Sequence, residues 1–517
     1  MSIKLLKSTA IVGAMTLLSR VLGLVRDIIF AAFFGASGGT DAFFVAFKIP
    51  NFMRRLFAEG AFSQSFVPVF SEYKETRSRE ALQDLIDHVA GTLGGILLFI
   101  SAIGSLAAPL LVVLFAPGFI DEPERYQLTS EMLTITFPYI FFIALTAFAG
   151  GILNSYSQFA VPAFTPVLLN ICLIGATVWA SPYFEQPIMA LAWGVAIAGL
   201  SQLLFQFPFL LKLHLMPRPR YRKQHEGVKQ ITQLMIPAII GSSVAQINLL
   251  LDTIIASFLI AGSVSWLYYS DRLVEFPLGI FGIALATVIL PSLSKQHARQ
   301  SAEAFSHTLD WALKLVMLIA LPATIGLFLL SGPLLATLFN YGEFNLHDAE
   351  MASMSLMAYA VGLPAFIFIK ILAPGYYARQ DTKTPVRIAI KAMISNMFLN
   401  VLFVVPMVLM EMEGPHTGLA LATSASAYLN AWLLYRGLRQ QAIYTPGPGW
   451  KPLWFYITGA NLAMMVFLLY FLPPLTSWNA WNLTDRISTL LGFVTIAATI
   501  YFIVIFLLGF RPKQLRQ

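Results

Sequence analysis

The sequence contains few charged residues for its length. Only 11% of its 517 residues are charged, whereas 57% are hydrophobic. A water-soluble chain carries roughly a quarter charged residues. The apolar residues also gather in runs, such as those beginning at Leu93 and Ser488, that reach the roughly 20 residues needed to cross a bilayer. This composition predicts an all-α polytopic membrane protein with no soluble domain between its spans.

Cysteine and histidine are also scarce. Cys172 is the one cysteine, which excludes an intrachain disulfide. The seven histidines contain no pair at the spacing of metal ligands, so we expect no metal site and no cofactor. The basic residues are not grouped with exposed aromatics. Despite the net charge of +7, no nucleic-acid partner is therefore expected.

Hydropathy and turn residues divide the chain into about 14 predicted transmembrane helices. The first apolar run continues to Gly35 without a small-residue cleavage site, so we expect it to be a span rather than a cleaved signal peptide. The predicted spans are 8–34, 41–71, 89–116, 130–155, 160–181, 187–212, 229–260, 264–294, 306–332, 350–377, 385–410, 417–440, 452–473 and 487–510.

Lysine and arginine are concentrated in alternate connections between these spans. One set of connections, which includes residues 74–79 and 212–229, is rich in them, whereas the opposite set is acidic and holds only Arg125 and Arg486. The positive-inside rule places the basic set in the cytoplasm. Because the number of spans is even, both termini are expected there too. The basic connections also suit contact with anionic membrane lipids.

An internal repeat predicts how the spans are grouped. The stretch DIIFAAFFGASGGTDAFF from Asp27 aligns with DTIIASFLIAGSVSWLYY from Asp252. This places span one over span seven, so two six-helix lobes of the same orientation are expected, as in parallel-repeat transporters. The predicted segments are an N-terminal lobe 1–215, a basic cytoplasmic linker 216–228, a C-terminal lobe 229–442 and two further spans in 443–517.

Several basic residues fall within the predicted spans. They are Arg20, Arg26, Lys48, Arg54, Arg55 and Arg272, with Lys314 and Lys370 nearer the span ends. A charge facing mid-bilayer lipid costs at least ~2.5–3.5 kcal/mol, so these residues must snorkel to an interface, form internal ion pairs or line water. Arginine is the residue favoured for bidentate contact with phosphate or carboxylate. A cavity for an anionic cargo is the hypothesis, and packing or snorkelling is the alternative for any one of them.

Helical spacing groups these charges with acids and prolines. Asp41, Lys48 and Arg55 recur every seven residues with Glu59 four residues later, so one face of the second span is expected to carry all four. The further cavity or gate candidates are Asp27, which shares a face with Arg20 but is equally suited to pair with Arg26, and Asp271 and Glu275 beside Arg272. Pro50 and Pro277 are expected to interrupt their spans and free backbone groups that protein or water must satisfy.

Asp252 is a lone acid within an apolar span, and Asn396 and Asn400 share a face of another span. Together they are candidates for an oxygen-ligated cation site. A buried, hydrogen-bonded Asp252 is the alternative.

Four segments resemble a known family. They are SRVLGLVRD (19–27), TDAFFVAFKIPNFMRRLFAEGAFSQSFVPVFSEY (40–73), SVSWLYYSDRLVEFPLGIFGIALATVILPSLS (263–294) and APGYYARQDTKTPV (373–386). They closely resemble the MurJ (MviN) family, the lipid II flippases of bacterial peptidoglycan synthesis, within the multidrug/oligosaccharidyl-lipid/polysaccharide (MOP) exporter superfamily. The resemblance runs essentially end to end.

The resemblance implies two lobes around a central cavity that opens alternately to cytoplasm and periplasm of the bacterial inner membrane, with a groove for the undecaprenyl tail on 443–517. It implies a transporter rather than an enzyme, with lipid II as its partner and cell-wall synthesis or division proteins as further partners. The implied cavity arginines are Arg20, Arg26, Arg54 and Arg272, the implied cavity acid is Asp41, and Lys48, Arg55 and Glu59 match further motif positions. The family's sodium site is matched only in part by Asp252, Asn396 and Asn400, so the coupling by Na⁺, H⁺ or membrane potential stays open.

Three other functions were weighed. A cation-coupled multidrug exporter of related fold would favour acidic and aromatic residues over arginines in its cavity. A polyprenyl-phosphate sugar transferase would need clustered carboxylates for a divalent ion, and no such cluster is found. A non-transporting scaffold would leave the intramembrane arginines unexplained.

Overall fold

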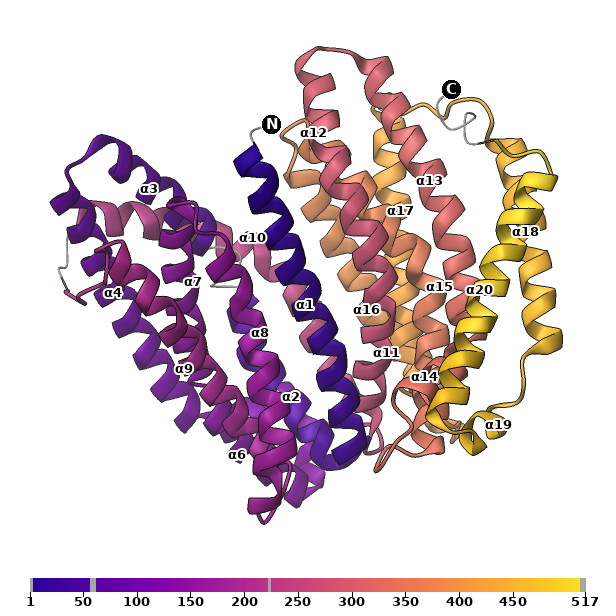
Figure 1. Ribbon diagram of the computed structural model, residues 1–517, viewed down its shortest axis with the longest axis horizontal. Coiled ribbons are helices and arrows are strands. Elements are labelled where there is room, and N and C mark those ends of the chain that lie inside the picture. The colour runs from indigo at the N-terminus through magenta and orange to yellow at the C-terminus, as the bar shows by residue number, and fades with distance from the viewer. Residues whose placement is uncertain (1–2, 56–61, 222–224, 512–517) are drawn as a thin grey trace. The chain divides into compact units, whose positions relative to one another are not determined.

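The computed structural model describes residues 3–55, 62–221 and 225–511, and every regular element among them is a helix (Figure 1). The predicted all-α class is confirmed. The chain divides into two compact units, unit 1 (Met1–Val264) and unit 2 (Ser265–Gln517).

The helices of unit 1 are α1 (Ile3–Phe34), α2 (Gly38–Arg54), α3 (Ser63–Thr76), α4 (Arg79–Leu106), α5 (Ala108–Phe115), η2 (Pro117–Asp121), α6 (Pro123–Thr136), α7 (Tyr139–Ser155), α8 (Ala160–Gly175), η3 (Ala176–Ala180), η4 (Ser181–Tyr183), α9 (Met189–Lys212) and α10 (Glu226–Ala256).

The helix α11 (Ser263–Pro277) begins at the boundary, and unit 2 continues with η5 (Leu278–Ile283), α12 (Ala284–Ala298), α13 (Ala302–Leu329), α14 (Ser331–Leu338), α15 (Leu346–Tyr377), α16 (Lys383–Leu409), α17 (Thr417–Gln440), α18 (Trp450–Phe471), α19 (Leu475–Ala480) and α20 (Leu483–Leu507).

Ten helical segments of the described chain are long and apolar enough to cross a membrane. They coincide with ten of the predicted spans. The other four predicted spans, 8–34, 41–71, 229–260 and 417–440, coincide with α1, α2 plus α3, α10 and α17. In α17, polar residues such as Ser424 lower the hydropathy, and its Oγ donates to the carbonyl of Ala358 on α15 at 2.8 Å. The helices therefore occur where they were expected, while the count of fourteen spans stays a prediction.

The prolines affect their helices in two different ways. α2 does not break at Pro50 as expected; it runs through this residue and ends at Arg54. Pro50 leaves the carbonyl of Ala46 without its helical donor, and the hydroxyl of Thr136 on α6 donates to that oxygen at 3.1 Å. Pro277, in contrast, is the last residue of α11 and is followed by the π-helical turn η5. A neighbouring helix can thus replace the lost bond and keep a proline-containing helix continuous.

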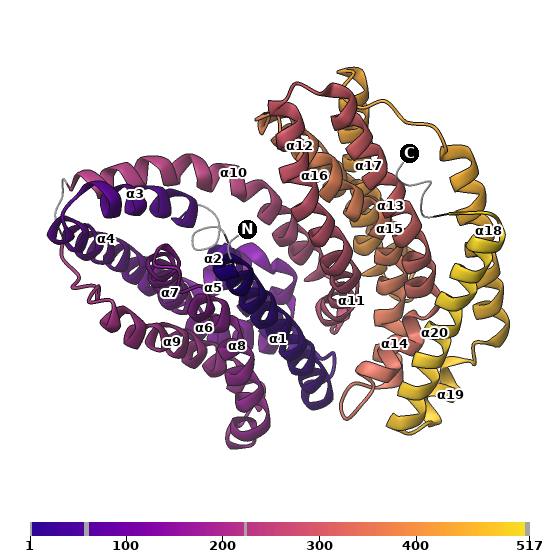
Figure 2. The same ribbon diagram turned by 45° about the horizontal axis from the view of Figure 1, so that its top comes forward.

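Unit 1 is held together by pairs of neighbouring helices. α1 packs along α8, α2 along α6, and α7 along α9 (Figure 1). α10 packs against α3 and α4 (Figure 2). An aromatic cluster that includes Phe62, Phe66, Phe70 and Phe148 forms a buried core. Because of these contacts α10 belongs to compact unit 1, whereas the predicted lobes 1–215 and 229–442 describe a sequence repeat and stay a prediction.

Unit 2 is built around α15, which packs against α13 and α17. α18 and α20 form a pair at the flank of this unit, and α18 also packs on α13 (Figure 2). The Tyr501 hydroxyl of α20 donates to the carbonyl of Leu318 on α13 at 2.9 Å. The two C-terminal helices are therefore bonded to unit 2 through α13.

A buried carboxylate fixes the connection between α17 and α18. Asp310 of α13 pairs with Lys314 at 2.7 Å, and its Oδ1 accepts from the Tyr444 hydroxyl at 2.7 Å and from Nε1 of Trp450 at 2.8 Å. Nζ of Lys314 also donates to the carbonyl of Pro448 at 2.7 Å. These bonds attach the connection to α13, so Lys314 is a structural cation.

Candidate substrate-binding site

Two of the predicted site residues of α1 form a buried ion pair. Nε and Nη2 of Arg26 donate to Oδ1 of Asp27 at 2.9 and 2.6 Å, and Nη1 donates to Oδ1 of Asn170 on α8 at 3.1 Å. Arg26 is 6% exposed and Asp27 is 0% exposed. Arg20, earlier on the same helix, is exposed. The structure therefore gives the two arginines of α1 different surroundings.

Asp41 is also engaged in a buried ion pair. It lies in the first turn of α2, which begins with Ser37 as its N-cap. Its Oδ2 accepts from Nη2 of Arg125 at 2.6 Å and from the backbone N–H of Gly262 at 2.7 Å. Asp41 is 0% exposed, so its carboxylate connects α2 with α6 and with the end of unit 1.

The basic residues of α2 have more accessible surroundings. Lys48, Arg54 and Arg55 are half-buried. Nε of Arg54 donates to Oδ1 of Asn51 at 2.9 Å. Glu59, the fourth residue of the predicted face, lies outside the described residues.

The length of α2 separates its charged residues into two places. Asp41 lies near its first residue, Gly38, and Arg54 is its last. At 1.5 Å per residue the two lie roughly 20 Å apart. One diphosphate group therefore cannot contact both at once, and the structure brings Arg54 together with Arg55 but not with Asp41.

The predicted charges of α11 lie at its accessible end. Nη1 of Arg272 pairs with Oε2 of Glu275 at 3.1 Å, and their side chains are 32% and 45% exposed. Asp271 is exposed. An ion pair this open to solvent contributes little to stability, and the guanidinium of Arg272 is accessible to solvent.

The candidate cation ligands lie on different units. Asn396 and Asn400 are buried on α16, and Nδ2 of Asn400 donates to Oδ1 of Asn396 at 3.1 Å. Nδ2 of Asn396 faces the Thr423 hydroxyl of α17 at 3.5 Å. Asp252 is half-buried on α10 in unit 1. The two asparagines form a polar contact between α16 and α17, and the three-residue cation site stays a prediction.

Sequence reasoning missed the roles of the two arginines in the acidic connections. Arg125 pairs with Asp41 and with Glu122, and its guanidinium carbon lies 3.8 Å from the ring centre of Phe119. Arg486 donates to the carbonyls of Ala336, Asn340, Asn479 and Trp481 at 2.9–3.0 Å. Both residues are buried. Their isolation among acidic residues was the available signal that they are structural.

Asp84, His88 and His225 form a cluster of side chains of the types that bind metal ions. Oδ1 of Asp84 lies 3.3 Å from Nδ1 of His88, and Oδ2 lies 3.3 Å from Nε2 of His225. Spacing between histidines alone does not reveal this Asp84–His88 pair. Nδ1 of His88 is also 2.8 Å from the carbonyl of Asp84. Since a carbonyl only accepts, this nitrogen carries a proton, and the group acts as a hydrogen-bonded link between α4 and the start of α10.

Comparisons with known proteins point to one family over almost the whole chain. A family model described as Lipid II flippase MurJ matches residues 30–492. A relative from Vibrio cholerae serotype O1, named probable lipid II flippase MurJ, is 48% identical, with 99% of this chain and 98% of the relative covered. A relative from Burkholderia cenocepacia, named lipid II flippase MurJ, is 42% identical, with 99% of each covered.

Solved structures show the same relationship. A lipid II flippase MurJ in an inward closed conformation matches with a TM-score of 0.78 at 28% identity, covering 95% of this chain and 97% of that one. An inward-facing MATE-family multidrug resistance transporter of the MOP superfamily matches with a TM-score of 0.66 at 14% identity, covering 84% of this chain and 98% of that one. At that identity, the second likeness shows a shared fold alone.

Proposed function

The chain belongs to the lipid II flippase MurJ family, and from this premise we propose that it moves lipid II, the undecaprenyl-diphosphate-linked peptidoglycan precursor, from the cytoplasmic to the periplasmic leaflet. It acts as a transporter and not as an enzyme. The observation that carries the proposal is the match of the family across residues 30–492.

The accessible arginines support an anionic cargo. Arg54 is half-buried at the end of α2, and Arg272 is one-third exposed on α11, so both side chains are accessible. Guanidinium groups bind phosphate oxygens in a bidentate manner. Arg54 and Arg272 are therefore proposed as the main ligands of the diphosphate, with Arg20, Lys48 and Arg55 as further basic residues of the path.

Arg26 and Asp41, the buried site candidates, are proposed to act differently from the accessible arginines. Arg26 and Asp41 each have a charged partner within 2.6 Å. Either residue must exchange that partner before it binds substrate directly. In the proposed transport cycle, alternating access exposes the cavity first to the cytoplasm and then to the periplasm. Asp27, Asp271 and Glu275 are then exchange partners for the arginines as the substrate leaves.

The lipid tail is proposed to stay in the membrane while the head group crosses. The flanking helices α18 and α20 expose large apolar side chains, among them Phe455, Leu462, Val466, Leu491 and Phe502. Such a surface suits the undecaprenyl chain, because apolar side chains pack against methylene groups without exposing polar groups to the lipid. Ordinary lipid contact is the alternative for this surface.

The location and further partners are proposed on the same premise. The protein is a multi-pass membrane protein, placed in the bacterial inner membrane with cytoplasmic termini because of its basic connections. Na⁺, H⁺ or the membrane potential are the proposed energy sources, and cell-wall synthesis or division proteins the proposed protein partners. A multidrug exporter is not favoured, since the MATE transporter shares only the fold.

Substitution of the two accessible arginines tests the proposal. Arg54→Ala and Arg272→Ala should each reduce lipid II transport by about tenfold or more, because a hydrogen bond to a charged group contributes about 1.5–3 kcal/mol. Arg299→Ala, at an exposed arginine after α12, is the matched control. The measurement is rescue of cells depleted of the native protein, with the membrane level of each variant determined in parallel. Full rescue by both test variants would contradict the assigned ligands.

A further inference from the structure

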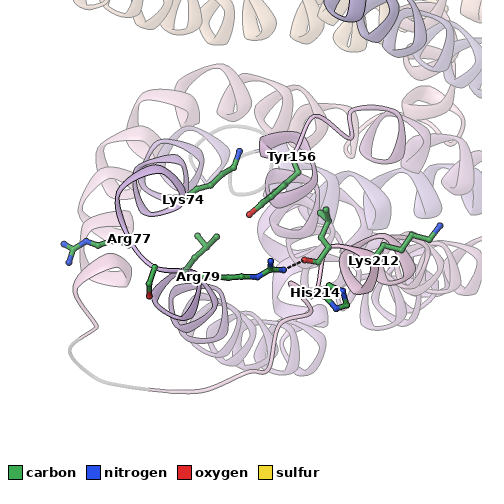
Figure 3. A pocket seen from close by; sticks show the side chains of 9 residues that line it. Lys74, Arg77, Arg79, Tyr156, Lys212 and His214 are labelled. Carbon is green, nitrogen blue, oxygen red and sulfur yellow. Dashed lines mark hydrogen bonds between the residues drawn. The ribbon is translucent and has the colours of Figure 1, made fainter.

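Unit 1 contains a basic pocket separate from the charges of α1 and α2. It is formed where the end of α3, the start of α4, the connection after α7 and the end of α9 meet, and its volume is about 430 Å³ (Figure 3). The lining residues are Lys74, Arg77, Ser78, Arg79, Leu82, Tyr156, Lys212, Leu213 and His214. Two of the connections that meet here, residues 74–79 and 212–229, belong to the lysine- and arginine-rich set expected on the cytoplasmic side.

Two of its cations are held in place by neutral groups. Nζ of Lys74 donates to the carbonyl of Ser155 at 2.9 Å and lies 4.6 Å from the ring centre of Tyr156. Nη2 of Arg79 donates to the carbonyl of Leu213 at 2.9 Å (Figure 3). An ammonium has three N–H donors and a guanidinium five. Both side chains are thus positioned by the fold while most of their donors remain for a ligand.

The lysines and arginines of this pocket outnumber the acids beside them, which are Glu75 and Glu80. Among the described residues, the one carboxylate within 4 Å of its lysines and arginines is that of Glu75, 3.9 Å from Nζ of Lys74 and 75% exposed. The buried cations Arg26, Arg125 and Lys314 instead have carboxylates within 2.7 Å. The pocket therefore differs from the structural ion pairs of the same chain.

The remaining polar groups of the pocket also favour an anionic ligand. Arg77 and Lys212 extend away from the middle of the pocket and lie at its rim (Figure 3). Ser78 is the N-cap of α4; its Oγ accepts from the N–H of Ala81 at 3.3 Å, and its side chain also hydrogen-bonds with the Glu80 carboxylate. The start of a long helix also favours negative charge.

We propose that this pocket binds a phosphate group, with Lys74 and Arg79 as its charged ligands. Arginine, lysine and a helix N-terminus are the groups that recur at phosphate sites. The apolar residues Leu82 and Leu213 line the same pocket, which suits the glycerol and upper acyl region of an anionic phospholipid. A soluble phosphate is the other source of the same chemistry. This site goes beyond transport, because none of its residues belongs to the proposed lipid II path.

The test uses the purified full-length protein and three probes. Dihexanoyl phosphatidylglycerol, dihexanoyl phosphatidylcholine and inorganic phosphate are titrated separately, and bound species are counted by native mass spectrometry. The double variant Lys74→Gln/Arg79→Gln is compared with Lys229→Gln/Arg299→Gln, which removes the same charge from exposed sites outside the pocket. The single variants Lys74→Gln and Arg79→Gln replace the double variant if it fails to fold.

The proposal predicts saturable binding of phosphatidylglycerol that is weakened by about tenfold or more in the double variant, since two charge-assisted contacts are lost. The control variant should bind as the wild type does. Saturable binding of the anionic lipid alone assigns the lipid as ligand; binding of inorganic phosphate that the double variant loses assigns the phosphate group itself.

Equal binding of both lipids, or unchanged binding in the double variant, would overturn the phosphate site. Arg54→Ala and Arg272→Ala should bind phosphatidylglycerol normally, so failure of the transport proposal and failure of this one give different results.

Discussion

Arg26 and Asp27 are neighbours in the sequence, and their side chains neutralise each other inside unit 1. The guanidinium donates twice to one carboxylate oxygen and once to Asn170, so it also connects α1 with α8. Removal of one partner from a buried pair leaves an uncompensated charge, which destabilises by about 3–5 kcal/mol. The structural role of Arg26 can therefore be separated from its proposed role in substrate binding.

A double-mutant cycle separates the structural role of Arg26 from its proposed role in substrate binding. Arg26→Gln and Asp27→Asn should each lower the thermal unfolding temperature in detergent, because each leaves one buried charge without its partner. The double variant Arg26→Gln/Asp27→Asn should recover most of that loss, since no net charge is then buried. If Arg26 also binds lipid II, the double variant should be stable and inactive in cell rescue. A stable and fully active double variant would restrict Arg26 to a structural role.

At the residue scale, the sequence predicted which residues are unusual but not which partners they have. The heptad spacing of Asp41, Lys48 and Arg55 was visible, yet Arg125, which binds Asp41, is 84 residues away in the chain. Local spacing carries no information about such a partner. The pairing of Arg26 with Asp27 was foreseen because the two are adjacent.

α2 shows how one element depends on its neighbour. Pro50 removes the donor for the Ala46 carbonyl, and the Thr136 hydroxyl of α6 replaces it at 3.1 Å. A buried acceptor left without a partner costs about 1–3 kcal/mol. This contact satisfies the carbonyl that Pro50 frees within α2, whose last residue is Arg54.

Thr136→Val tests this dependence, because valine keeps the shape of the side chain and loses the hydroxyl. The variant should be destabilised by about 1–3 kcal/mol, seen as a lower thermal unfolding temperature in detergent. Thr499→Val is the matched control, since Thr499 is exposed and its hydroxyl donates within its own helix. Equal stability of both variants would show that another group satisfies the Ala46 carbonyl.

At the element scale, apolar runs located the helices well. The run from Leu93 lies in α4 and α5, and the run from Ser488 lies in α20. The effect of the prolines was harder to predict, because it depends on what lies opposite. Pro277 ends α11 as expected, whereas α2 runs through Pro50 and a hydroxyl from another helix satisfies the freed carbonyl.

At the scale of the whole molecule, resemblance over long segments identified the family, while composition alone identified only a membrane protein. Residues 40–73 and 263–294 carry motifs specific enough to name the family, and the family model covers both. The compact units could not be foreseen in the same way. α10 follows the predicted linker 216–228, yet it packs on α3 and α4 of unit 1, because packing depends on surfaces that a repeat pattern does not describe.

The central claim concerns the molecule as a whole: it brings lipid II to the outer leaflet. The most direct measurement depletes the protein in its own cells and adds an external enzyme that cleaves the lipid-linked peptidoglycan precursor. The account predicts that precursor accumulates and that the fraction reached by the enzyme falls, with both effects reversed when the protein is expressed again. An unchanged accessible fraction, in cells shown to lack a second flippase, would contradict it.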